Sequence, residues 1–166
     1  MRAKGKHDGF TLIELLVVIA LVGLVVTLVV LRIDRDAGQL AQLEAERFYA
    51  LVTHAQDESL LSGRPYAVEI DEASGSYHFL KPGKPWQVIT DDDVLRSRQV
   101  PEGVGLHMEM QQPDTIGHMV VIDGLGLITP FVLTVSGGAK KFEVSSDTGQ
   151  AVILKKDATA PQQKRN

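Results

Sequence analysis

The feature that most constrains this chain is an apolar run near its beginning. Residues 15–31 contain no charged side chain, and residues 10–13 extend the run toward the N-terminus, with Glu14 as the one interruption. A helix over residues 10–31 would be about 33 Å long at ~1.5 Å per residue, which is enough to cross the hydrocarbon core of a bilayer. The sequence therefore predicts a membrane-spanning helix. A lone carboxylate beside the entrance to a membrane is costly, so the position of Glu14 calls for an explanation.

A short basic segment precedes the run. Residues 1–9 carry three basic side chains and one acidic side chain. A cleaved secretory signal would have a shorter apolar core and a small-residue cleavage site behind it, whereas the charged residues 32–36 follow here. An uncleaved anchor with its basic end in the cytoplasm fits the positive-inside rule better. Neither interpretation explains why Gly9 directly precedes Phe10, or why Glu14 lies where it does.

The junction between the basic segment and the run resembles the processing signal of type IV pilins and type II secretion pseudopilins. The resembling residues are Gly9-Phe10-Thr11-Leu12-Ile13-Glu14, followed by the apolar run. The resemblance implies that a prepilin peptidase cleaves between Gly9 and Phe10, and that Phe10 becomes the N-methylated first residue. It also implies that Glu14 meets the amino terminus of a neighbouring subunit during assembly. That positive terminus would be the partner that the carboxylate needs.

The helix is expected to continue beyond the run as an amphipathic segment. Apolar side chains recur at helical spacing and predict a stripe that packs on a globular domain. The predicted stripe is Leu40, Leu43, Phe48, Leu51, Val52 and Ala55, and the residues placed mostly on the other faces are Gln42, Glu44, Glu46, Gln56 and Asp57. Gly38 favours a bend. Gly63 and Pro65 predict that the helix ends near Ser62.

From Pro65 onward the pattern alternates with a period of two, which is typical of strands with one buried face. The expected strands are residues 66–71, 77–80, 86–90, 106–111, 118–123, 131–135, 141–145 and 151–155. Gly137-Gly138 indicates a hairpin. A long helix followed by seven or eight short strands predicts an α+β fold with antiparallel sheets.

The β-rich half also resembles one branch of the pilin-like family, the H-type minor pseudopilins and their type IV pilus relatives. The resembling stretches are residues 86–101 and 124–152. The expected organisation is a leader over residues 1–9, a membrane or filament-core helix over 10–32, its amphipathic continuation over 33–62, a β-rich domain over 63–156 and a flexible tail over 157–166. The resemblance implies a single-pass protein of the bacterial inner membrane with its C-terminal domain in the periplasm.

Two functions from different classes follow from this resemblance. The first is a minor pseudopilin, a structural subunit near the tip of the type II secretion pseudopilus that supports export of folded proteins across the outer membrane. Its implied partners are the other minor pseudopilins, the major pseudopilin and the prepilin peptidase. The alternative is a FimT-like minor type IV pilin that acts in pilus assembly or DNA uptake. A third reading, an anchored β-domain with no role in a filament, leaves Glu14 unexplained.

Residue composition gives no indication of an enzyme. The chain has no cysteine, which excludes disulfides and thiolate catalysis, and its five histidines lack metal-ligand spacing. We predict no cofactor and no metal. Asp91-Asp92-Asp93 is interpreted as a solvated acidic loop, with calcium binding as the alternative. The formal net charge is −4, and about −6 without the basic leader, so no nucleic-acid partner is expected.

Overall fold

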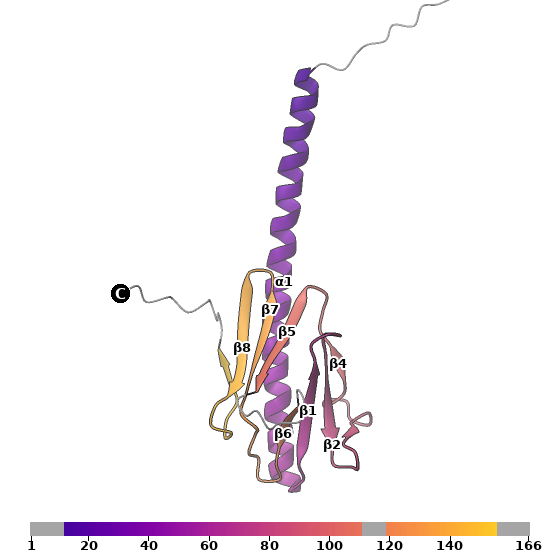
Figure 1. Ribbon diagram of the computed structural model, residues 1–166, viewed down its shortest axis with the longest axis vertical. Coiled ribbons are helices and arrows are strands. Elements are labelled where there is room, and N and C mark those ends of the chain that lie inside the picture. Colours follow the sequence, from indigo (N-terminus) through magenta and orange to yellow (C-terminus); the bar gives the residue numbers. More distant parts are fainter. Residues whose placement is uncertain (1–11, 111–118, 156–166) are drawn as a thin grey trace, which may run out of the picture.

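The computed structural model describes residues 12–110 and 119–155, with the backbone alone for residues 28–36. Helix α1, Leu12–Ser62, is 51 residues long, or about 76 Å at ~1.5 Å per residue. Its first half projects away from the rest of the molecule, and its second half packs on a β-rich domain (Figure 1). The predicted leader, with Gly9 and Phe10, and the predicted tail over residues 157–166 lie outside the described residues.

Nine strands follow α1 across the described residues, and all of them pair antiparallel. The first sheet has the order β3-β2-β1-β6, with β4 also paired to β2, and its strands are β1 Tyr66–Asp71, β2 Ser76–Lys81, β3 Gln87–Val88, β4 Arg98–Gln99 and β6 Met119–Ile122. The second has the order β5-β7-β8-β9, and its strands are β5 Val104–Met110, β7 Phe131–Gly137, β8 Lys140–Ser146 and β9 Ile153–Lys155. The predicted α+β class with antiparallel sheets is confirmed.

Two short strands differ from the prediction. Strand β3 covers only Gln87–Val88 of the expected residues 86–90. Strand β4 lies inside a stretch that was expected to be a connection, where its Gln99 pairs with Ser76 and the amide of Val100 donates to the carbonyl of Gly75. A strand of two residues has no alternating pattern to recognise, because a period of two needs several residues to become visible.

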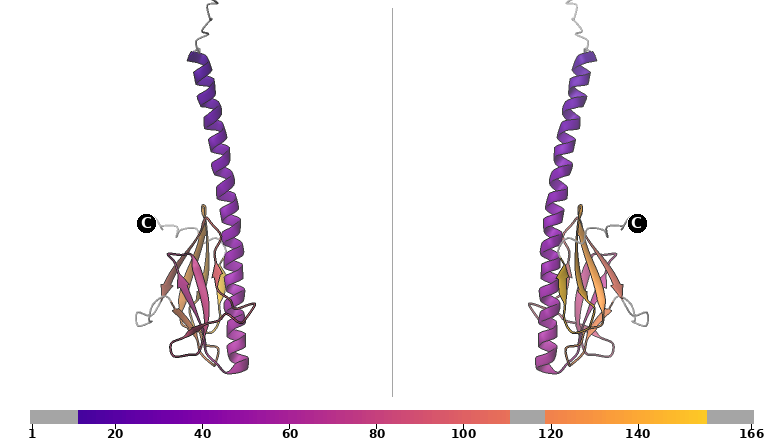
Figure 2. Two further views of the ribbon diagram at one scale, coloured as in Figure 1. Left: turned by 90° about the vertical axis from the view of Figure 1, so that its right-hand side faces the viewer. Right: turned by 90° about the vertical axis from the view of Figure 1, so that its left-hand side faces the viewer.

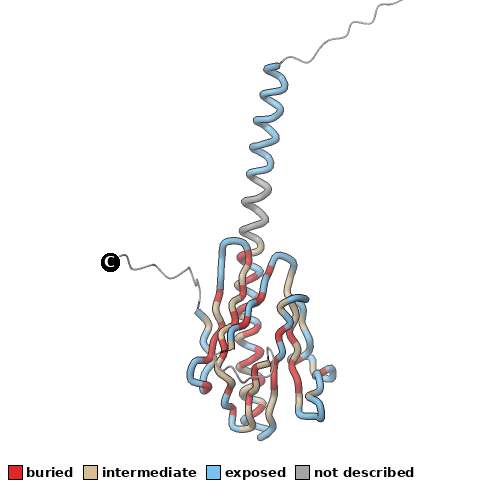
Figure 3. The backbone as a smooth tube through the Cα atoms, viewed as in Figure 1, coloured by how far each residue is buried: buried red, intermediate tan, exposed pale blue. Residues whose placement is uncertain are grey.

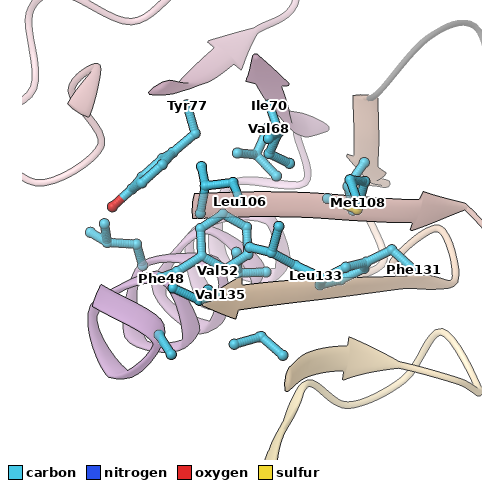
Figure 4. Close-up of a cluster of buried hydrophobic side chains, with 14 of the residues drawn as sticks. Phe48, Val52, Val68, Ile70, Tyr77, Leu106, Met108, Phe131, Leu133 and Val135 are labelled. Atoms are coloured by element: carbon cyan, nitrogen blue, oxygen red, sulfur yellow. The ribbon is translucent and has the colours of Figure 1, made fainter. Parts of the chain in front are cut away.

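The core lies where the two sheets meet the second half of α1. The helix packs mainly against β7 and β8, and Figure 2 shows it running along one side of the domain. Three aromatic rings from three elements meet edge to face, with centroids 5.2 Å apart for Phe48 and Tyr77 and 6.4 Å apart for Phe48 and Phe131. These rings are surrounded by aliphatic side chains of both sheets (Figure 4). Packing against both sheets thus fixes α1 on the domain.

The buried stripe of α1 is shifted from the predicted one. Leu40 is 36% exposed and Leu43 is 58% exposed, so their assignment to the stripe was wrong. The residues that face the domain are Ala41, Glu44, Ala45, Phe48, Leu51, Val52, Ala55 and Ser59. The buried stripe begins with small side chains, which let the β7–β8 hairpin lie close to α1. A Cβ atom added at Gly137 would be only 2.8 Å from the Cβ atom of Ala41. The prediction chose the large leucines, and it therefore missed a contact surface made of alanines.

Glu44 is the second correction on this helix. It was placed on a polar face, but its side chain is 1% exposed. Tyr77 of β2 donates a hydrogen bond of 2.7 Å to Glu44 Oε1, and Arg47 forms an ion pair of 2.6 Å with Oε2. A buried carboxylate is tolerated when donors satisfy it, and these two donors come from separate elements. Glu44 therefore contributes to the attachment of α1 to the first sheet.

Gly38 lies within α1 and Gly63 directly follows its last residue. The helix continues through Gly38 without interruption, and Gly38 is buried because the side chain of Lys140 crosses it, with Lys140 Cδ 3.0 Å from the place of a Cβ atom. The predicted end of the helix at Ser62 is confirmed. Gly63 follows with a φ of 65°, a left-handed conformation that suits glycine, and its amide donates to the carbonyl of Ser59 over 2.8 Å.

Candidate functional site

The first candidate site is the projecting part of α1, residues 12–27, which we call the stalk. Its large apolar side chains are between 46% and 78% exposed, and Figure 3 shows the stalk exposed along its length. They are Leu12, Ile13, Leu15, Leu16, Val17, Val18, Ile19, Leu21, Val22, Leu24, Val25 and Val26. A helix that is apolar all round is stable only when lipid or other protein covers it. The stalk is therefore a surface for an apolar environment that the domain itself does not supply.

The predicted membrane-spanning segment, residues 10–32, extends beyond the stalk at both ends. Across the parts of the chain that the structure describes, no helix is long and apolar enough to pass through a membrane.

Glu14 lies in the first turn of α1, and its side chain is exposed. The amide groups of a first turn carry partial positive charge, so a carboxylate there is favourable. Its predicted meeting with the amino terminus of a neighbouring subunit stays a prediction, as does cleavage between Gly9 and Phe10.

Gly23 and Thr27 lie four residues apart on the exposed stalk, and therefore on the same side of the helix. Nothing lies within 4 Å of the place where a Cβ atom would stand on Gly23. The hydroxyl of Thr27 donates to the carbonyl of Gly23 over 2.8 Å, so this polar group is satisfied inside the helix. Small residues and internally satisfied hydroxyls are typical of helices that pack closely in an apolar medium.

The second candidate site lies at the opposite end of the molecule, where α1 ends. Four leucines are exposed there, and we call them the distal leucines: Leu60 at 55%, Leu61 at 84%, Leu125 at 76% and Leu127 at 48%. Two come from the last turn of α1 and two from the connection between β6 and β7. These four leucines were not predicted as a site from the sequence. The sequence does contain one indication, because Leu125 stands between two glycines, and such a pattern is typical of a surface turn.

The domain also carries a polar hollow beside β2 and β4. A hollow of about 320 Å³ is lined by Ser74, Ser76, His78, Ser97, Arg98 and Gln99. Its hydroxyls interact with one another, with 2.8 Å between the Oγ atoms of Ser74 and Ser76 and 3.3 Å from Ser76 Oγ to His78 Nε2. Within the described residues, no cluster of three histidine, aspartate or glutamate side chains could hold a metal ion.

The acidic loop has local partners. Asp91 forms an ion pair with Lys81, with its two oxygens 2.9 and 3.0 Å from Nζ, and this hydrogen bond lowers the pKa of Asp91. Asp92 Oδ1 accepts the amides of Val94 and Leu95 at 2.6 and 2.9 Å, which is an Asx turn. Two of the three carboxylates therefore shape the loop itself.

A long helix with an exposed apolar first half and a second half packed on antiparallel sheets defines the class of pilin-like filament subunits. Residues 4–30 match the model for the prokaryotic N-terminal methylation motif. Residues 44–154 match the model for the type II transport protein GspH. The chain belongs to this GspH family.

Curated relatives agree with the family. The type II secretion system protein H of Escherichia coli (strain K12) is 31% identical over 137 residues, which cover 77% of this chain and 80% of the relative. The protein of the same name from Aeromonas hydrophila is 28% identical over 152 residues, which cover 79% of this chain and 81% of the relative. This chain therefore aligns with most of the length of each relative.

Solved structures show the same fold. The minor pseudopilin EpsH from the type 2 secretion system of Vibrio cholerae superposes with a TM-score of 0.62 at 23% identity, over 70% of this chain and 96% of that one. The type IV minor pilin FimU of Pseudomonas aeruginosa reaches a TM-score of 0.52 at 13% identity, over 78% of this chain and 96% of that one. The likeness to FimU shows a shared fold alone, whereas the matching family and the curated relatives favour the type II secretion function over the type IV pilin alternative.

Proposed function

We propose that this chain is a minor pseudopilin, a structural subunit near the tip of a type II secretion pseudopilus that supports export of folded proteins across the outer membrane. The observation that carries the proposal is the stalk, because its apolar side chains are exposed on a helix whose other half is fixed to a folded domain. Membership of the GspH family supports this reading.

The stalk has two successive environments in this proposal. Before assembly it lies in the inner membrane, with the β-rich domain in the periplasm. After assembly it lies in the core of the filament, covered by the stalks of the other minor pseudopilins and the major pseudopilin. Both environments are apolar, so the same surface serves in each. The methylation motif over residues 4–30 supports the membrane anchoring.

Processing and assembly would use three residues at the start of the chain. The prepilin peptidase cuts between Gly9 and Phe10, and Phe10 becomes N-methylated. Glu14, in the first turn of α1, then pairs with the amino terminus of a neighbouring subunit. In an apolar filament core this pairing offsets the cost of burying both charges, and it favours one position for the incoming subunit.

Deletion of the gene tests this function. We expect release of exported proteins to fall and DNA uptake to stay unchanged when both are measured in the same strain. Restoration by the full chain on a plasmid is the control. Retained secretion with lost transformation would contradict the proposal and favour the alternative function as a minor type IV pilin.

A further inference from the structure

The turn that displays Leu125 is held directly against the end of α1. A Cβ atom added at Gly124 would lie 2.5 Å from the carbonyl oxygen of Gly63, and one at Gly126 would lie 2.7 Å from Leu60 Cγ. Gly126 also has a φ of 77°, which disfavours any side chain. Leu125 stands between these two contacts and is nevertheless 76% exposed. The turn therefore presents Leu125 at a defined place over the last turn of the helix.

Several polar groups of this turn, at Asp123 and Gly126 above all, have hydrogen-bond partners within the molecule. Asp123 Oδ1 accepts the amides of Leu125 and Leu127 at 2.8 and 2.9 Å. The carbonyl of Asp123 accepts the amide of Gly126 at 2.9 Å and the hydroxyl of Ser59. The carbonyl of Gly126 accepts Gln56 Nε2 at 2.7 Å. What the turn offers to a partner is thus mainly apolar side chains.

The apolar character of the distal leucines favours some kinds of protein partner over others. An extended peptide brings backbone groups that need hydrogen-bond partners, usually at the edge of a sheet. A helix satisfies its own backbone and can lay an apolar face on leucines. The distal leucines therefore fit an apolar helix better than a strand.

An apolar helix of this kind is displayed by the stalk of a pilin-like chain. Within one molecule the contact cannot form, because Leu60 lies 33 residues after Thr27 on the same helix, about 50 Å away along its axis. If all stalks enter one membrane from the same side, they are parallel. The contact is then head to tail between two chains displaced along the helix axis, and it is not a symmetric pair.

We propose that the distal leucines are a docking surface for the apolar stalk of another pilin-like chain. This inference rests on the proposed function and adds to it the surface that receives the next subunit. The stalk attaches the chain to subunits on the membrane side, and the distal leucines attach it to a subunit farther from the membrane.

Photo-cross-linking identifies the occupant in the assembled filament. Leu125→benzoylphenylalanine is introduced into the full chain in a secreting strain, and the cross-linked peptides are mapped by mass spectrometry. The expected product joins position 125 to the apolar N-terminal helix of a pilin-like chain. Products with the β-rich domain of any subunit, with position 125 of a second copy, or no protein product at all would overturn the proposal. Val94→benzoylphenylalanine, on a loop where Val94 is 44% exposed, is the matched control and should not capture a stalk.

Substitution gives an independent measurement. Leu125→Asp should lower the amount of the chain in sheared pseudopili about tenfold, which is the loss expected when burial of one leucine is removed. Leu125→Met and Val94→Asp should stay near wild type, and limited proteolysis of the full chain in detergent shows whether each variant is folded. Equal amounts of Leu125→Asp and Leu125→Met would contradict the docking surface. Absence of the wild-type chain from pseudopili would instead contradict the proposed function.

Discussion

The phenol of Tyr77 donates a hydrogen bond of 2.7 Å to Glu44 Oε1, and both side chains are buried. Glu44 belongs to α1 and Tyr77 to β2, so this bond joins the helix to the first sheet across the core. Arg47 satisfies the second carboxylate oxygen from a position on the surface. Removal of one donor leaves a buried charge with a single partner, which costs more than the hydrogen bond itself contributes.

Tyr77→Phe is therefore expected to lower the free energy of unfolding by about 1–3 kcal/mol, because it removes the donor and leaves Glu44 Oε1 without it. Denaturant unfolding of the full chain in detergent measures the change. Tyr49→Phe, at a partly buried tyrosine of α1, is the control and should cost less. Equal losses for the two variants would show that the bond to Glu44 adds nothing to stability.

The same pair predicts a dependence of stability on alkaline pH. Burial raises the pKa of Tyr77 above its usual value, and the hydrogen bond to the Glu44 carboxylate raises it further. The folded chain then keeps a proton that the unfolded chain releases near pH 10. This contribution is complete below about pH 10 and is lost as the pH rises above it. Unfolding midpoints between pH 8 and 11 should fall more steeply for wild type than for Tyr77→Phe, and parallel curves would contradict this assignment.

Gly137→Ala tests the contact between the β7–β8 hairpin and α1. The added Cβ atom would overlap the carbonyl oxygen of Ala37, so the hairpin must move away from the helix. We expect a loss of about 1–3 kcal/mol in the free energy of unfolding, as for other overpacked sites. Gly23→Ala is the matched control, since nothing lies within 4 Å of its added Cβ atom, and it should leave the stability of the domain unchanged.

Gly9→Leu tests the processing site. If the peptidase requires glycine before the cleaved bond, this variant should stay at precursor size on a gel of whole cells, while the wild-type chain appears at mature size. Gly5→Leu, four residues earlier in the leader, serves as the control. A mature band for Gly9→Leu would place cleavage elsewhere.

Glu14→Ala separates assembly from processing. The variant should reach mature size normally, because the cleaved bond is intact, but it should be poorly incorporated into pseudopili because the partner terminus loses its carboxylate. Glu14→Asp is the comparison that keeps the charge. Wild-type amounts of Glu14→Ala in sheared pseudopili would remove the pairing argument.

Local patterns predicted the elements of this chain better than they predicted its contacts. The end of α1 at Ser62 and the β7–β8 hairpin depend on nearby residues such as Gly63 and Gly138, so they could be read directly. The burial of Glu44 could not, because it depends on Tyr77, which is 33 residues away in sequence. A carboxylate is normally exposed, and only a distant donor reverses that expectation.

Of the two candidate sites, one could be predicted from neighbouring residues and the other could not. The stalk is an apolar run interrupted only by Glu14, so its apolar character could be predicted from the sequence. Leu125 lies near Leu60 only because Gly124 and Gly126 let a turn lie on the end of α1, more than 60 positions earlier. No helical or strand period connects Leu125 with Leu60, so a sequence pattern does not bring them together.

Because α1 is one helix from Leu12 to Ser62 and packs on both sheets, the stalk and the domain share a single connecting element. A displacement applied to the stalk as a subunit leaves the bilayer would therefore act directly on the domain that α1 carries. The pseudopilus would then advance by stiff increments, and each subunit would pass the thrust from below to the subunit above it.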